Sequence, residues 1–139
     1  MEQERRKIVV DTGSVVLDIE DTHGKYLGQI EIIPTDSDII KRYKDVVDKL
    51  NGTKLPENPQ DEDIMAFSDM VKEQVNYLMN YDVSSSVFSV CGPLTALASG
   101  DFYFENVLNA IGGAIEQIMN TRVEKRLAKI RKATAKYHK

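Results

Sequence analysis

Residues 100–139 read GDFYFENVLNAIGGAIEQIMNTRVEKRLAKIRKATAKYHK, and they decide the fold because apolar residues recur in them every three or four positions. The recurring residues are Phe104, Val107, Leu108, Ile111, Ile115, Ile118, Met119, Val123, Leu127 and Ile130. Residues at this spacing share one face of an α-helix. The pattern predicts one long helix over residues 101–137, capped by Asp101. At about 1.5 Å per residue it would extend roughly 50 Å, so its far end should project or find a partner.

Charged side chains are divided unevenly along the chain. Residues 122–139 contain 8 basic and 1 acidic side chains, a formal charge of +7, whereas residues 1–121 contain 10 basic and 21 acidic ones, a formal charge of −11. The basic residues of the C-terminal part are Arg122, Lys125, Arg126, Lys129, Arg131, Lys132, Lys136 and Lys139. Such a separation predicts that the C-terminal part binds a partner or a second copy, and it does not indicate a reaction.

Two kinds of partner fit this basic helix. It could line the phosphate backbone of a nucleic acid, or it could meet an acidic protein surface, including that of a neighbouring subunit. The net charge of −4 disfavours general nucleic-acid affinity. No aromatic residue interleaves the basic ones before Tyr137, so a stacking platform for single strands is not supported. We expect a protein partner, and nucleic acid is the alternative.

The apolar stripe outlasts the domain that could bury it, which predicts a homo-oligomer formed through the long helix. The side chains expected at partner contacts are the apolar Ile118, Leu127 and Ile130 and the basic Arg122, Lys125, Arg126, Lys129, Arg131 and Lys132. Inside the helix lies Gly112–Gly113. Each glycine costs roughly 1 kcal/mol relative to alanine in a helix, so the pair indicates close helix packing or a bend.

The first third of the chain has the alternating pattern of half-buried strands. Val15, Leu17 and Ile19 alternate with outward residues, and Ile30 and Ile32 do the same. Turn-forming residues at 11–14 and 21–24 separate these runs from each other and from an apolar run at 7–10. Residues 7–33 therefore predict a three-stranded antiparallel β-meander, whose apolar face helices must cover.

Residues 36–81 predict two helices. The first, over 36–50, follows a cap at Thr35 and stops at Asn51–Gly52. The second begins after Asn58, with Pro59 at its first position, and continues to about Tyr81.

Residues 82–100 break the periodicity, which predicts an irregular segment with a short helical turn near 94–97. Together these patterns predict a single α+β domain over residues 1–139, in which the β-meander packs with two helices and precedes the long helix.

Residues capable of catalysis are few. His23 and His138, the only histidines, are near no carboxylate or cysteine pattern that would make a metal site, and both are expected on the surface. Cys91 lies in an apolar stretch and is expected to be a buried, inert thiol. The serines at 84–86 lack the Gly-x-Ser-x-Gly motif. We expect no enzyme activity.

Carboxylates cluster at two predicted helix starts, in Asp36-Ser37-Asp38 and in Asp61-Glu62-Asp63. A helix N-terminus favours negative charge by about 0.3 to 1 kcal/mol, so capping explains both clusters. No glycine pattern forms a nucleotide-binding loop. No metal or cofactor is expected.

The sequence also bears on location. The first ten residues, MEQERRKIVV, are charged and contain no continuous apolar segment of a secretory signal. The most apolar window, Val87–Leu97, is about half of the roughly 20 residues that span a bilayer. A single cysteine agrees with a reducing compartment. We expect a cytoplasmic protein without a membrane partner.

Several stretches carry a family resemblance: the β-rich start, IEIIPTDSDIIKRYKDVVDKL at 30–50, NYLMNYDVSSSVF at 76–88, and the Gly100–Lys139 helix with its basic end. In this order they resemble the tail assembly chaperone-like proteins of phages and prophages of Gram-positive bacteria. The resemblance covers most of the chain and consists mainly of apolar spacing. It implies a non-enzymatic protein that holds the tape-measure or tail-tube protein in the host cytoplasm until assembly. A DNA-associated protein and an oligomeric virion connector or tail component are the alternatives.

Overall fold

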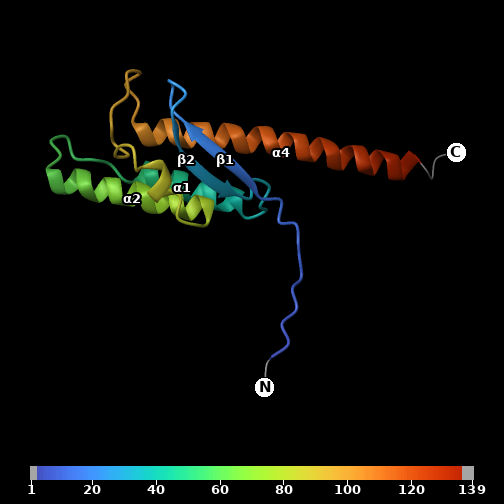
Figure 1. The fold of residues 1–139 in the computed structure, drawn as a ribbon. Coiled ribbons are helices and arrows are strands. Elements are labelled where there is room, and N and C mark those ends of the chain that lie inside the picture. Colours follow the sequence, from blue (N-terminus) through green and yellow to red (C-terminus); the bar gives the residue numbers. More distant parts are fainter. Residues whose placement is uncertain (1–2, 136–139) are drawn as a thin grey trace.

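The computed structural model describes residues 3–135 and has an α+β fold, as the sequence predicts (Figure 1). The elements, in chain order, are β1 (Val15–Glu20), β2 (Tyr26–Ile32), α1 (Ile39–Gly52), α2 (Asp61–Met79), α3 (Ser84–Val87) and α4 (Tyr103–Ala135). A small sheet is therefore followed by helices, and the last helix is by far the longest.

The two strands form an antiparallel hairpin in which Val15 lies opposite Ile32 and Leu17 opposite Ile30. The turn is the one that the sequence predicts, because the Asp21 carboxylate accepts hydrogen bonds from the backbone N–H groups of His23 and Lys25, at 2.8 and 2.9 Å. The predicted alternation is confirmed: inward residues of both strands are buried or half-buried, and their neighbours are exposed.

The predicted third strand at residues 7–10 is wrong, because the described chain contains no strand before Val15. Ile8, Val9 and Val10 are largely exposed in a segment that leads away from the body (Figure 1). The turn after this segment is held by other contacts: the Asp11 carboxylate accepts the Gly13 N–H, and the Gly13 carbonyl accepts a hydrogen bond from Arg122 in α4. These contacts direct the segment away from the edge of β1.

Both middle helices exist, and their starts differ from the predicted positions. Helix α1 begins at Ile39, because the Asp36 carboxylate accepts the N–H of Asp38 and terminates the preceding turn. Helix α2 begins after Gln60, whose N–H donates to the Asp63 carboxylate. The Asp61-Glu62-Asp63 cluster thus takes part in capping, as predicted. For the Asp36-Ser37-Asp38 cluster the prediction is wrong, because these residues precede α1 and the cap residue Asp38 makes no side-chain capping hydrogen bond. Helix α2 ends at Asn80, which adopts a left-handed conformation with φ of 63°.

The segment between α2 and α4 is more ordered than the sequence suggests. The predicted helical turn at 94–97 is wrong, and the serine run forms the short helix α3 instead. The Asn76 side-chain oxygen accepts the N–H groups of Val83 and Ser84, which fixes α3 to the end of α2. A single bridge between Ala96 and Phe102 then leads into α4.

One hydrophobic core joins these elements. Its buried residues come from β2, α1, α2, α3 and the first three turns of α4: Ile30, Ile32, Ile39, Val46, Val71, Val75, Leu78, Met79, Val83, Val87, Phe104, Val107 and Ile111. Between residues 112 and 133, the part of α4 after Ile111 whose burial is described, no residue is buried. The core therefore anchors only the start of the longest helix.

Helix α4 runs past the hairpin, and its distal half extends beyond the rest of the chain (Figure 1). It begins at Tyr103, two residues after the predicted cap, where the Glu105 carboxylate accepts the N–H of Phe102. Its 33 residues correspond to about 50 Å. The predicted end at 137 lies outside the described residues. The prediction of a projecting helix is confirmed.

Candidate interaction surfaces

The distal part of α4, residues 123–133, is an amphipathic segment that we call the arm. Val123, Leu127 and Ile130 are 50%, 44% and 46% exposed. Their spacing of four and three residues places them on one face of the helix. An apolar face that its own chain does not bury is the kind of helix surface that enters a hydrophobic groove on a partner.

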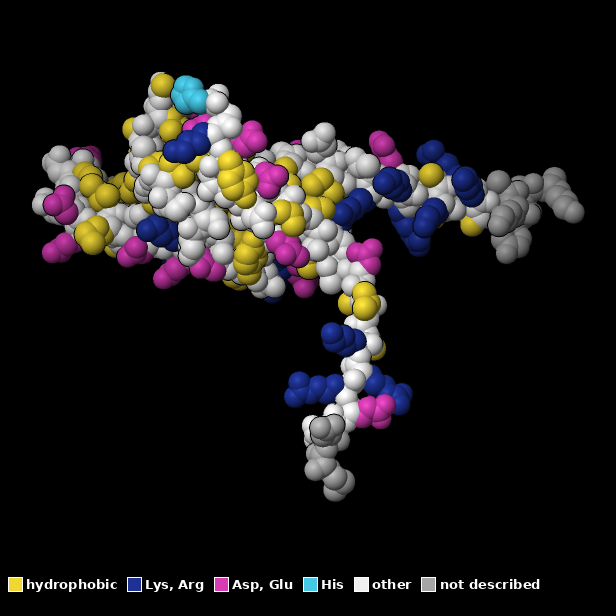
Figure 2. All heavy atoms as spheres, viewed as in Figure 1, with side chains coloured by type: hydrophobic (Ala, Val, Ile, Leu, Met, Phe, Trp, Pro, Cys, Tyr) yellow, Lys and Arg dark blue, Asp and Glu magenta, His cyan; other side chains and the backbone are white. Residues whose placement is uncertain are grey.

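The rest of the arm is basic. Its cations are Lys125, Arg126, Lys129, Arg131 and Lys132, all of them exposed, and Glu124 is its one acidic residue. Figure 2 shows these basic side chains gathered along the projecting helix. The predicted Lys136 and Lys139 lie outside the described residues. The structure thus brings together most of the basic residues that the sequence singled out.

Two of the predicted partner-binding residues lie before the arm, and one of them is bound to the body. Arg122 is half-buried, and its Nη1 donates to the Gly13 carbonyl at 2.7 Å and to the Thr35 hydroxyl at 3.3 Å. Ile118 is half-buried and lies one helical turn before Arg122, on the same side of α4. Arg122 therefore fixes the base of the arm, and neither residue belongs to the exposed apolar face of the arm.

A groove of about 850 Å³ lies between α1 and the first half of α4. The α1 wall includes Ile40, Tyr43 and Val47, and the α4 wall includes Leu108, Ile115 and Met119. Ile40 is 70% exposed. Among the described residues, the charged side chains in the lining are Glu105 and Glu116. Most side chains that line the groove are therefore apolar, and its two charged ones are acidic.

Gly112 and Gly113 also line this groove. A methyl group added at either position would meet no atom within 4 Å. The interpretation that the pair marks close helix packing within the chain is therefore wrong, because the space beside the glycines is open. The sequence did not predict the groove, because its second wall, α1, lies about 60 residues earlier in the chain. The glycine pair was the one feature of the local sequence that indicated an open space beside α4.

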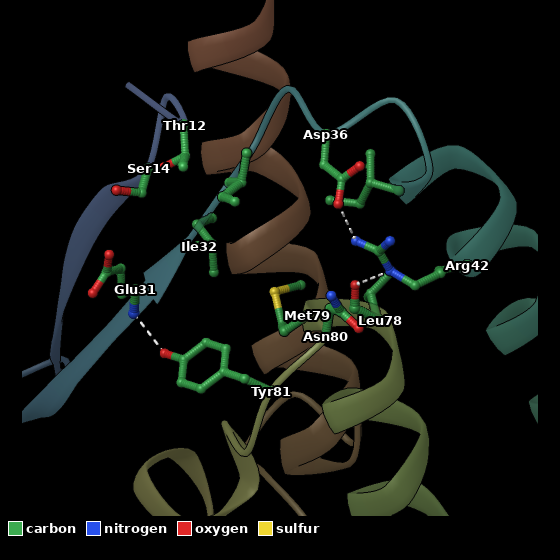
Figure 3. A pocket seen from close by; sticks show the side chains of 12 residues that line it. Thr12, Ser14, Glu31, Ile32, Asp36, Arg42, Leu78, Met79, Asn80 and Tyr81 are labelled. Carbon is green, nitrogen blue, oxygen red and sulfur yellow. Dashed lines mark hydrogen bonds and ion pairs between the residues drawn. The ribbon is translucent and has the colours of Figure 1, made fainter. Parts of the chain in front are cut away.

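A smaller cavity of about 260 Å³ lies between β2, α1 and the end of α2 (Figure 3). At its wall the Arg42 guanidinium binds the Asp36 carboxylate at 2.9 Å and the Leu78 carbonyl at 3.0 Å. The N–H of Asp38 and the Arg42 guanidinium lower the pKa of Asp36. The Tyr81 hydroxyl accepts the N–H of Glu31. These polar contacts hold the helices and the sheet together.

The serines, the cysteine and the histidine considered in the sequence analysis do not come together in one site among the described residues. Asp82 accepts hydrogen bonds from the hydroxyls of Ser84 and Ser85, and the Ser85 contacts lower its pKa most. These two serine hydroxyls therefore bind the carboxylate that precedes α3. Cys91 is half-buried, not buried as expected. His23 is exposed in the hairpin turn, as expected, and His138 lies outside the described residues.

Within residues 3–135, no group of three or more histidine, cysteine or acidic side chains is placed to hold a metal ion. Among the described helices, none has the length and apolar character needed to span a membrane. A comparison with known proteins finds no matching family model, no matching curated protein and no matching solved structure.

Proposed function

We propose that this protein is a non-enzymatic binding protein, and that the arm of α4 is the element that binds another protein. The observation that carries this proposal is the exposed apolar face of Val123, Leu127 and Ile130 on a projecting basic helix. Exposed apolar faces of this kind mark interaction sites. The basic side chains on the same helix favour a partner surface that is acidic around an apolar centre.

The apolar face favours protein over nucleic acid as the partner. A duplex would contact the basic side chains through its phosphates and would leave Val123 and Leu127 in water. The formal charge of −11 on residues 1–121 would also repel a polyanion near the body. A protein partner can cover the apolar face and neutralise the cations together.

The resemblance to tail assembly chaperone-like proteins supplies the class of partner. We propose that the arm binds the tape-measure or tail-tube protein of a phage or prophage in the host cytoplasm before assembly. The protein could also remain in the finished particle as an oligomeric component. In either case its task is to hold another protein, and no bond of the partner is changed.

Co-expression with fragments of tape-measure and tail-tube proteins tests this proposal. Leu127→Glu places a charge in the apolar face and should abolish capture of the partner. Ala128→Glu adds the same charge on a different side of the same helical turn, at another exposed position, and should leave capture intact.

Fluorescence anisotropy with a labelled DNA duplex tests the alternative, a DNA-associated function. We expect feeble duplex binding at physiological salt. Submicromolar duplex binding that weakens when Lys125, Lys129 and Lys132 are neutralised, together with no captured tail protein, would replace the proposal with a DNA-associated function.

A further inference from the structure

The apolar residues of α4 are arranged symmetrically about Met119. Ile115 and Val123 lie four residues to either side, Ile111 and Leu127 lie eight residues away, and Leu108 and Ile130 lie eleven residues away. The first member of each pair lines the α1–α4 groove, and the second lies on the apolar face of the arm. The first half of α4 thus forms one wall of the groove. The second half has apolar residues at the mirrored positions, so a helix of its sequence could lie in that groove.

We propose that the arm of one molecule occupies the α1–α4 groove of a second copy, and that the second copy returns the contact. Two antiparallel α4 helices, related by a twofold axis at Met119, place Leu108, Ile111 and Ile115 of the groove at the same heights as Ile130, Leu127 and Val123 of the other arm. A twofold contact is self-complementary, so one pairing implies the other. The two molecules form a closed dimer.

The repeat of eleven residues keeps this contact in register. Leu108, Met119 and Ile130 are separated by eleven residues each, which is close to three helical turns. These residues therefore stay on one side of a nearly straight helix over about 33 Å. The side chains can remain in contact without strong supercoiling.

The glycine pair has a role in this dimer that it lacks in the single chain. In the twofold register, Gly113 lies opposite Lys125 and Gly112 opposite Arg126 of the second copy. The open space beside the glycines admits the aliphatic stems of these long side chains. The same absence of Cβ atoms lets the two helices approach closely.

Charge complementarity identifies the second copy as the occupant. Within residues 3–135, the charged residues that line the groove are both acidic, Glu105 and Glu116. Five of the six charged residues of the arm are basic. The register places Glu105 within one turn of Lys129 and Lys132 of the second copy. The pairing also brings the basic arm against the body, since residues 1–121 have a formal charge of −11.

This dimer does not depend on the proposed function, but it uses the same arm. A tail protein that binds the arm would therefore compete with the second copy. The dimer covers the apolar face of the arm until such a partner is present.

Cysteine cross-linking tests the register. In a Cys91→Ser background, two molecules of Met119→Cys should form a disulfide with each other under mild oxidation. The twofold axis brings the Cβ atoms of residue 119 from the two copies together. Gln117→Cys, exposed on the opposite side of α4, is the control and should cross-link poorly. Leu127→Cys should also fail, because its two copies lie 16 residues apart along the helices, about 24 Å. Efficient cross-linking through Leu127→Cys would indicate a parallel pair and overturn the proposal.

Light scattering tests the groove. The wild-type chain should have the mass of a dimer, and Ile40→Lys should raise its dissociation constant about tenfold or more, since a cation then meets the basic arm. Ile40 is 70% exposed, so the variant should fold. A wild-type monomer at every concentration, or a dimer unaffected by Ile40→Lys, would contradict the proposal. Ile40→Lys should still capture the tail protein, whereas Leu127→Glu should lose both contacts, so failure of the dimer and failure of the proposed function are distinguishable.

Discussion

The Nη1 atom of Arg122 lies 2.7 Å from the carbonyl oxygen of Gly13 and joins two residues that are 109 positions apart. This hydrogen bond attaches α4 to the start of β1, at the point where the helix leaves the body. Before it, α4 contacts the core and lines a groove; after it, α4 is an exposed basic arm. The contact therefore sets the direction of both the arm and the N-terminal segment.

Replacing Arg122 with alanine should destabilise the protein by about 1 to 3 kcal/mol, since a charged donor is removed from a half-buried carbonyl. Denaturant unfolding measures this change. Hydrogen exchange should also accelerate at the start of β1. Arg126→Ala, at an exposed position one turn further on, should alter the unfolding free energy by less than about 0.5 kcal/mol. Equal effects of the two substitutions would contradict the assignment of Arg122 to the body.

Alanine at Gly112 or Gly113 should stabilise the chain by roughly 0.5 to 1 kcal/mol each, because the added methyl meets no atom within 4 Å and favours the helix. Alanine at Gly13 should do the opposite, since this residue has a φ of +74° and its Cβ would lie 2.9 Å from the Arg122 guanidinium. Thermal unfolding of the three variants compares them. A stabilised Gly13→Ala would show that the Arg122 contact is absent in solution.

Stability should depend on pH through Asp36. Its pKa is lowered from the ordinary value of 3.8 by the Asp38 N–H and the Arg42 guanidinium, so the ionised carboxylate stabilises the fold above that value. This contribution is lost as the pH falls through the lowered pKa. Wild type should therefore be more stable than Asp36→Asn near neutral pH, and the difference should vanish in acid. Asp48→Asn, at an exposed position of α1, is the control.

Deleting residues 1–10 should change the unfolding free energy by less than about 0.5 kcal/mol, because Ile8, Val9 and Val10 are largely exposed. Urea titration of the shortened chain checks this expectation. A loss of more than about 1 kcal/mol would mean that this segment pairs with β1, as the sequence pattern predicts.

Local patterns account for the parts of the fold that were predicted correctly. The alternation around Leu17 and Ile30 fixed the hairpin, and Asp21 with Gly24 fixed its turn, because these signals act between near neighbours. The run at 7–10 has the same strand pattern and forms no strand. Its outcome depends on Arg122, which no local pattern near residue 10 could reveal.

The candidate interaction surfaces, too, could be predicted only where the signal is local in the sequence. Spacing and charge identified Leu127, Ile130 and the exposed cations of the arm. They also selected Ile118 and Arg122, because periodicity along α4 does not show which side the body occupies. The groove could not be predicted, since Ile40 and Leu108 come together only when α1 and α4 pack on a common core.

Hydrogen exchange over residues 123–133 tests most directly whether the arm is covered by protein. The full chain is measured alone at low concentration, with the captured tail protein, and with duplex DNA at physiological salt. We predict fast exchange of the arm in the dilute chain, because an uncovered helix opens readily. Adding the tail protein should slow exchange in the arm, and adding DNA should not. Protection by DNA together with no protection by the tail protein would contradict the proposed function.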